Sequence, residues 1–323
     1  MISELTPLAP SDIRARTRPL AIVYVYLAEL AWALLIATPV HAWARRVWGN
    51  HPDGDAVLWL PGGRDLLTWI GGEDAALGVV SRATLVLLVV GTVAMQVPLG
   101  ALLASLSFSR EGFPGSAPRS PRARTALHVG ISAFWSMAGL LVLGTIAGGL
   151  VVGVGSLASS AVDHALSDRL GDARTFQIRV VLLALFVLLA CIVGVIVDLA
   201  RAGVARETCL AAMRGSSASG WTMLLRGLRV AFSVIRRSFR TAVLAWAWRA
   251  VVSLVLVGIG YVIAQAIGGK GGTMLLLLWI AHQAIVVARV ALRASWLARA
   301  VGLVAAVQNA REAIAEAQPT EPG

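Results

Sequence analysis

The chain of 323 residues is dominated by apolar side chains, since hydrophobic residues make up 58% of it and charged residues only 14%. Its mean hydropathy is +0.78, and a water-soluble globular domain of this length does not normally have such a composition. A net charge of +11 would suit a nucleic-acid-binding protein, but the arginines stand at the ends of apolar runs and no aromatic-basic motif accompanies them. The composition therefore predicts an integral membrane protein and gives no support for nucleic acid as a partner.

Six apolar runs in the sequence are long enough to cross a bilayer as helices. They cover residues 20–40, 79–106, 126–152, 179–199, 242–266 and 273–293. We therefore expect an all-α integral membrane protein with six transmembrane helices in three hairpins, forming one transmembrane domain over residues 20–304. Residues 1–19 and 305–323 are predicted to be cytoplasmic tails, and residues 41–75 and 156–178 outer loops.

The distribution of arginines predicts the orientation of these helices. Basic residues gather in segments 1–19, 108–124 and 200–241, which the positive-inside rule assigns to the cytoplasm. Both termini are then cytoplasmic, and the protein is expected in the inner membrane of a bacterium. A cleaved signal peptide is an alternative interpretation of the first run, because Ala42-Trp43-Ala44 imitates a cleavage site. That run is longer than an ordinary signal sequence, however, and it contains Glu29.

The most basic segment, residues 200–241, separates the fourth apolar run from the fifth. From Trp221 onward, a helical period places its arginines on one narrow arc: Arg226, Arg229, Arg236, Arg237 and Arg240. Apolar side chains fall on the other side: Trp221, Leu225, Leu228, Phe232, Ile235 and Phe239. The pattern predicts an amphipathic helix at headgroup level whose arginines bind anionic lipid or a partner protein. The alternative is that the apolar face packs beneath the helical bundle and the arginines are only solvated.

Glycines recur in the third apolar run. Gly144 and Gly148, and likewise Gly149 and Gly153, are separated by four positions. This small-xxx-small pattern lets two helices approach closely. We therefore expect these glycines to pack against a partner helix, either in this chain or in a second copy of it.

Three ionisable residues are predicted near the middle of the bilayer: Glu29, Arg249 and His282. An isolated charge at that depth costs at least about 2.5 kcal/mol, so we expect Glu29 and Arg249 to pair, with His282 within hydrogen-bonding distance. Such a cluster is either a structural clamp between the first span and the last hairpin or a relay for protons or ions.

No signature of catalysis accompanies these features. Cys191 and Cys209 lack a CxxC partner, the histidines are scattered, and Glu29 is the one carboxylate well inside an apolar run. We therefore expect no enzymatic activity, no cofactor and no metal site. The first functional hypothesis is a non-catalytic membrane component that binds a partner or anionic lipid through its basic cytoplasmic surface. The second is a small transporter or permease that uses Glu29, Arg249 and His282.

Overall fold

The computed structural model describes residues 5–49, 74–110, 119–216, 219–267 and 272–317. Its helices, in chain order, are α1 (Pro19–Trp48), α3 (Asp74–Ala94), α4 (Gln96–Ser107), α5 (Ala123–Ser132), α6 (Phe134–Leu170), α7 (Asp172–Met213), α8 (Gly220–Ile267) and α9 (Thr273–Ala317). Strands β1 (Leu5–Pro7) and β2 (Phe108–Arg110) and the 3-10 turn η1 (Ala15–Thr17) accompany them. The fold is therefore almost entirely helical.

Six helical segments are long and apolar enough to cross a membrane. They are Pro19–Arg46, Gly78–Ser107, Phe134–Leu166, Asp172–Met213, Gly220–Ile267 and Thr273–Ala313. In the most apolar part of α7 only 6% of the residues are buried inside the protein, so the remaining apolar surface needs hydrocarbon around it. The predicted all-α membrane fold is confirmed at this level, and the chain is a multi-pass membrane protein.

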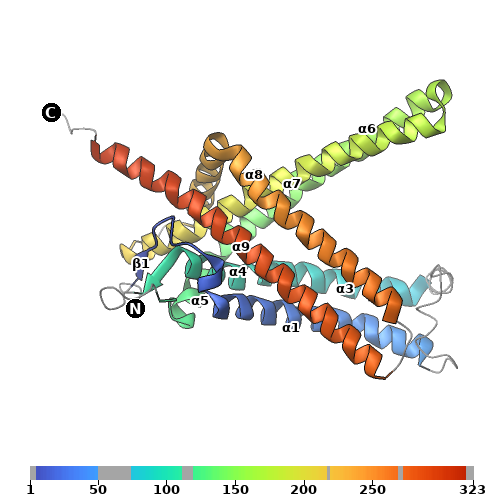
Figure 1. Cartoon of the computed structure of the whole chain (residues 1–323), viewed down its shortest axis with the longest axis horizontal. Coiled ribbons are helices and arrows are strands. Elements are labelled where there is room, and N and C mark those ends of the chain that lie inside the picture. The colour runs from blue at the N-terminus through green and yellow to red at the C-terminus, as the bar shows by residue number, and fades with distance from the viewer. Residues whose placement is uncertain (1–4, 50–73, 111–118, 217–218, 268–271, 318–323) are drawn as a thin grey trace.

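Helices that follow one another in the sequence lie side by side, α1 with α3, α6 with α7 and α8 with α9 (Figure 1). One contact that holds α1 against α3 is that of Trp32. Its indole occupies the space left by Gly91 and donates to the Leu87 carbonyl oxygen at 3.1 Å. The three pairs spread apart at one end of the molecule and meet at the other, where β1 and the last turns of α9 also lie.

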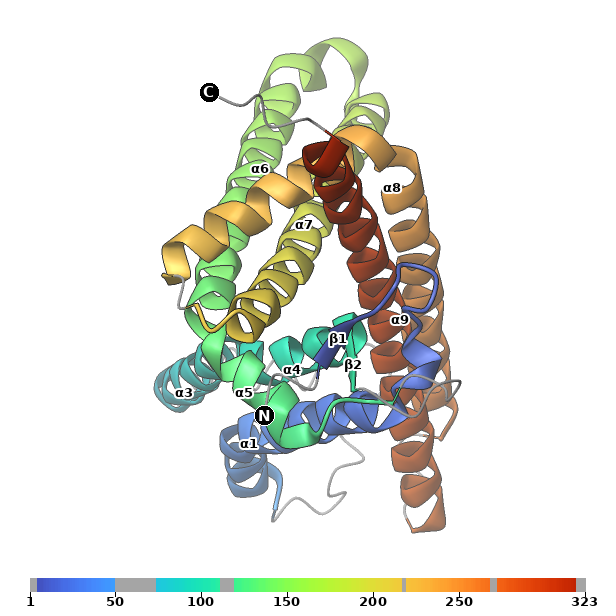
Figure 2. The same ribbon diagram turned by 90° about the vertical axis from the view of Figure 1, so that its left-hand side faces the viewer.

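We call the meeting point of the three pairs the hub. It consists of α4, α5, β1, β2 and the segments 195–209, 223–234 and 294–308 of α7, α8 and α9, each of which turns one face into the core (Figure 2). Helix α4 contacts α1, α5, α6, α7 and α9 and is buried along nearly its whole length, as expected for a helix that is apolar on every side. It is separated from α3 at Met95 because Pro98 has no N–H to donate to the carbonyl of Ala94.

Residues 5–18 pack into the hub, a contact that the predicted cytoplasmic tail over residues 1–19 did not include. β1 pairs antiparallel with β2, with Leu5 opposite Arg110. Leu8 and Ile13, which follow β1 in the sequence, are buried in the hydrophobic core. A strand of three residues is too short to show an alternation of polar and apolar residues. The sequence therefore did not predict this pairing in a polar, proline-rich segment.

The expected outer loop at 156–178 is helical instead. α6 continues to Leu170 and α7 begins at Asp172, with Gly171 at a φ of 76° between them. Asp163 forms an ion pair with Arg179 at 2.7 Å, and Ser159 accepts from Nε of the same arginine at 3.3 Å. These polar residues join α6 to α7, so they do not interrupt either helix.

Three other boundaries also differ from the expected ones. The first residues of the predicted span 126–152 form α5, which packs on α4 as a separate helix. At the other end of the chain α9 continues to Ala317, and Val304 and Ala305 are buried at the boundary of the expected tail 305–323. Residues 41–48 of the expected outer loop 41–75 belong to α1, and residues 50–73 lie outside the described residues.

Candidate functional site

The arginine-rich segment at the start of α8 is set apart by a kink. Gly220 begins the helix, and Ser238, with φ −140° and ψ 35°, breaks the helical geometry before the apolar part of α8. We call residues 220–240 the basic arm. The arm therefore runs in a different direction from the apolar part of α8 (Figure 2).

The basic arm presents three faces, where the sequence had indicated two. The buried face consists of Met223, Leu224, Gly227, Val230, Ala231 and Val234. The arginines of the arc are all exposed: Arg226, Arg229, Arg236, Arg237 and Arg240. Trp221, Phe232 and Phe239 are also exposed, at 64%, 59% and 45%. Leu228 and Ile235 of the predicted apolar face are partly buried against the core, whereas its aromatic rings are exposed. The role of this face as a lipid contact stays a prediction.

Two glycines fix the basic arm to α7. A Cβ on Gly227 would lie 2.7 Å from the carbonyl oxygen of Ala200, and one on Gly203 would lie 3.2 Å from the Cα of Gly227. Small residues permit such close backbone approach. The signal in the sequence was Gly227 with Ala231 one turn later, a small-residue pair outside the predicted spans.

The glycines predicted to pack in α6 differ in their surroundings. A Cβ on Gly144 would lie 2.8 Å from Val197 of α7. The positions at Gly148, Gly149 and Gly153 have no described atom within 4 Å of such a Cβ. Gly144 therefore lies at the contact between α6 and α7, whereas packing of the other three on a second copy stays a prediction.

Glu29 and Arg249 line one cavity of about 500 Å³ between α1, α7, α8 and α9. Within the described ranges no hydrogen bond or ion pair joins them, because Arg249 donates to Ser295 Oγ at 3.1 and 3.0 Å and lies 4.4 Å from the Trp248 ring. His282 lies beside Gly260 of α8 and has no hydrogen bond to either residue in the described part of the chain. The structure thus brings two of the three residues to one cavity without forming the expected pair.

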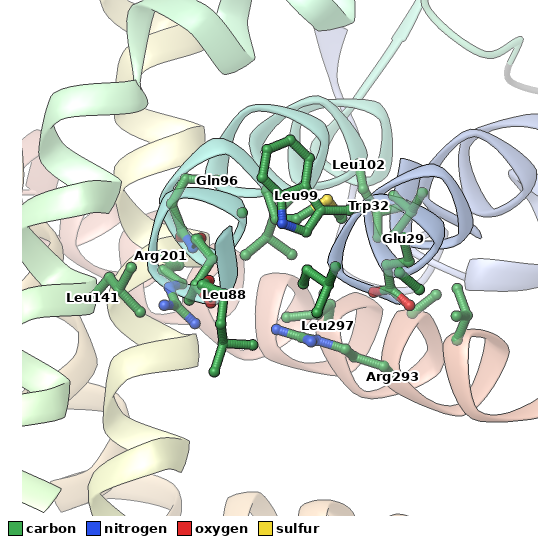
Figure 3. A pocket seen from close by; sticks show the side chains of 18 residues that line it. Glu29, Trp32, Leu88, Gln96, Leu99, Leu102, Leu141, Arg201, Arg293 and Leu297 are labelled. Atoms are coloured by element: carbon green, nitrogen blue, oxygen red, sulfur yellow. Dashed lines mark hydrogen bonds between the residues drawn. The ribbon is translucent and has the colours of Figure 1, made fainter. Parts of the chain in front are cut away.

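The electrostatic neighbours of Glu29 are Arg293 and Arg289. Glu29 and Arg293 also line an adjoining cavity of about 410 Å³, together with Gln96 and Arg201 (Figure 3). These four side chains come from α1, α9, α4 and α7; in Figure 3 Gln96 and Arg201 lie together on one side of the cavity, Glu29 lies on the other, and Arg293 extends between them. Sequence reasoning missed this grouping because the four residues are far apart along the chain.

A row of polar contacts joins α7 to α9 beside these cavities. Asp198 accepts from Arg201 Nη1 at 3.2 Å and from Trp296 Nε1 at 2.9 Å. Further along, Gln308 donates to Glu207 at 2.7 Å. The carboxylate of Asp198 is therefore already engaged by protein donors.

Arg18 fastens the start of α1 to the hub. Its guanidinium donates to the carbonyl oxygens of Ser105 at 2.8 Å and Phe108 at 3.3 Å, and to Ser120 Oγ at 3.0 Å. Burial lowers the pKa of this guanidinium, but arginine remains charged at neutral pH. An arginine expected only to mark a cytoplasmic tail is thus a structural bridge.

Chemically, the basic arm offers exposed charge and aromatic rings, and the two cavities offer arginine donors with a few carboxylates. Both arrangements suit binding of an anion. Comparison of the chain with protein-family models, with curated proteins and with solved structures finds no significant match.

Proposed function

We propose that this protein is a non-catalytic component of the bacterial inner membrane, with six helices in three hairpins and both termini in the cytoplasm, that binds anionic lipid headgroups or a membrane protein partner through its basic arm. The observation that carries the proposal is the arm itself. One face of the arm is fixed on α7, and the two other faces leave its arginines and its aromatic rings exposed side by side.

The physical chemistry of a membrane surface favours such a helix as an interfacial element. Each basic residue close to an anionic leaflet contributes about 1 kcal/mol of attraction, and tryptophan and phenylalanine favour the boundary between headgroups and acyl chains. Because Gly203 and Gly227 hold the arm against α7, its arginines need little further ordering when they bind. β1 and the end of α9 lie at the same end of the molecule as the arm (Figure 1), in keeping with the charge distribution.

Lipid binding by the full-length protein tests the proposal. The quadruple variant Arg226→Gln, Arg229→Gln, Arg236→Gln and Arg237→Gln should bind anionic phosphatidylglycerol at least about tenfold more weakly, with zwitterionic phosphatidylcholine unaffected. Native mass spectrometry of the purified protein with added lipid measures both. The matched control removes the same charge from exposed arginines at the opposite end of the molecule: Arg45→Gln, Arg46→Gln, Arg169→Gln and Arg174→Gln. Equal losses in the two variants, or no loss in the first, would contradict the proposal.

The second candidate is a small transporter or permease that uses Glu29, Arg249 and His282. The observation in its favour is the cavity that Glu29 and Arg249 line together. Proteoliposomes containing a pH-sensitive dye provide the test, since a relay through Glu29 should carry protons and Glu29→Gln should stop them. Identical dye traces for the wild type and the variant would reject this candidate.

A further inference from the structure

The two cavities around Glu29 adjoin each other, because Glu29, Val290 and Arg293 line both of them. Their volumes of about 410 and 500 Å³ lie in the range of small-molecule binding sites. We call them together the hub cavities. They are lined by helices α1, α3, α4, α6, α7, α8 and α9, and the buried face of the basic arm is not part of their wall.

Positive charge exceeds negative charge around the hub cavities. The arginines are Arg201, Arg249, Arg289 and Arg293, and the carboxylates are Glu29 and Asp198. Asp198 is engaged by Arg201 and Trp296, so Glu29 alone faces the remaining arginines. Arg249 has a further cationic neighbour in Arg299. Like charges in a medium of low dielectric repel strongly, and an anion bound among them would remove this cost.

Two polar atoms on the wall of the smaller cavity lack a partner among the described residues. Arg201 is only 7% exposed, and its Nε has no hydrogen-bond partner in that part of the chain. Gln96 is 4% exposed, and its Oε1 has no partner within the described ranges either, while its Nε2 donates to the carbonyl oxygen of Thr92. Buried polar groups are normally satisfied. The wall therefore offers an unused donor, which suits a phosphate oxygen, and an unused acceptor, which suits a hydroxyl group.

The rest of the smaller cavity is apolar. Val25 of α1, Leu99 and Leu102 of α4 and Leu297 of α9 line it, and Figure 3 shows Leu99, Leu102 and Leu297 around the polar side chains. A ligand that places an anion at the arginines thus meets hydrocarbon on the other side. Amphiphilic molecules combine both properties.

We propose that the hub cavities bind the phosphodiester group of an anionic phospholipid with a hydroxyl-bearing headgroup. The phosphate lies between Arg201 and Arg293, the headgroup hydroxyl donates to Gln96 Oε1, and an acyl chain follows the apolar wall. Glu29 selects the charge of the ligand. A phosphodiester with one negative charge is accepted, whereas a doubly charged phosphomonoester is repelled by the carboxylate.

Thermal unfolding of the full-length protein, delipidated in detergent, tests the site. Phosphatidylglycerol should raise the unfolding temperature of the wild type more than phosphatidic acid, phosphatidylcholine or inorganic phosphate does. Arg289→Gln with Arg293→Gln should weaken the apparent affinity for phosphatidylglycerol about tenfold, since the charge-assisted contact of Arg293 and the attraction of a second cation of the hub cavities are lost. Arg45→Gln with Arg46→Gln is the control of equal charge and should leave it unchanged. In Glu29→Gln, the difference between the rise in unfolding temperature caused by phosphatidylglycerol and that caused by phosphatidic acid should be smaller than in the wild type.

A variant that keeps every charge guards against misfolding as the cause. Ala33 lines the smaller cavity and is exposed to it, so Ala33→Trp should fill the acyl-chain position and abolish stabilisation by the lipid. A phosphatidylglycerol with a photoreactive acyl chain should crosslink to peptides containing Val25 or Leu99 in the wild type, and not in Ala33→Trp.

Three outcomes decide the matter. Undiminished stabilisation of the Arg289 and Arg293 double variant, or crosslinks confined to other helices, would overturn the site. Stabilisation by inorganic phosphate equal to that by phosphatidylglycerol would uphold the arginines as a phosphate site and overturn the assignment to a lipid. The quadruple variant of the basic arm should keep the crosslinks to Val25 and Leu99, so failure of the proposed arm function and failure of this site are distinguishable.

Discussion

Single buried arginines decide much of the local structure at the hub. Arg18 donates to two buried backbone carbonyl oxygens and to the hydroxyl of Ser120, which is exposed. An acceptor left without its donor costs more than the bond itself contributes. Arg201 and Arg18 are both buried, but only Arg18 bridges segments that are distant in the sequence, since Arg201 bonds to Asp198 of its own helix.

Arg18→Met should therefore destabilise the protein by about 2–4 kcal/mol, because the apolar side chain retains the volume and removes every donor. Chemical unfolding in detergent, followed by tryptophan fluorescence, measures the change. Arg16 is exposed on the same segment, and Arg16→Met should stay within about 0.5 kcal/mol of the wild type. Similar losses for both variants would show that the bridge adds no stability.

Double-mutant cycles locate the electrostatic partner of Glu29. Arg293 is the charged residue that acts most strongly on Glu29. The effects of Glu29→Gln and Arg293→Gln on the free energy of unfolding should therefore be coupled by about 0.5–1.5 kcal/mol. Glu29→Gln and Arg249→Gln should add independently, since Arg249 is held by Ser295. The exchange of charges, Glu29→Arg with Arg249→Glu, should accordingly fail to restore the folded yield. Recovery of that yield would favour the pair expected from the sequence.

At the scale of the helices, close contacts between backbones set the geometry. Gly227 lies against Ala200 where the basic arm meets α7, and Gly144 lies against Val197 where α6 meets α7. Helix α7 has 42 residues and is about 63 Å long, more than twice the hydrocarbon thickness of about 30 Å. Part of α7 therefore has to extend beyond the bilayer, and the basic arm packs on Ala200, Gly203 and Val204, which follow the apolar run 179–199.

Gly227→Ala should destabilise the protein by about 1–3 kcal/mol, because the new methyl group would meet the backbone of α7 at a distance that real Cβ atoms do not adopt. Gly258 of the same helix has open space around it, so Gly258→Ala should be neutral or stabilise by up to about 1 kcal/mol. Thermal unfolding of the two variants gives the comparison. A neutral Gly227→Ala would mean that the arm is not fixed on α7.

For the whole molecule, membrane orientation is the property that the proposed function depends on. Ser216 lies in the exposed turn before the basic arm, and Arg174 is exposed near the turn between α6 and α7. In a Cys191→Ser background, an impermeant maleimide should label Arg174→Cys in intact spheroplasts and Ser216→Cys only after the membrane is opened. Cys209 is fully buried and should remain silent in both. The reverse labelling pattern would invert the topology.

The predictable part of the fold is what the bilayer demands of the sequence. Apolar runs revealed all six candidate spans, because a helix in hydrocarbon has to be apolar over about 20 residues. The hub was not predictable in this way. α4 is as apolar as a membrane helix yet is buried in the protein, α5 contains the start of an apolar run yet forms a separate short helix, and the β1–β2 pair is too short to leave a pattern. The helical period of the sequence predicted the arc of arginines in the basic arm. The hub cavities were not predictable, because they depend on Glu29, Gln96, Arg201 and Arg293, which only the tertiary fold brings together.

The pairing of β1 with β2 bears on how the chain is made. Thr6 and Ser109 are 103 positions apart, and Arg18 and Ser105 are 87 apart. A chain is synthesised and folds from its N-terminal part onward. The first helix therefore enters the membrane well before Ser105 and Ser109, the partners of Arg18 and Thr6, leave the ribosome. The start of the chain therefore reaches its final place only after residues 105–120 have been made. A chain released before that point lacks what holds its beginning in place, and the rest of the hub forms later still, when α7, α8 and α9 are complete.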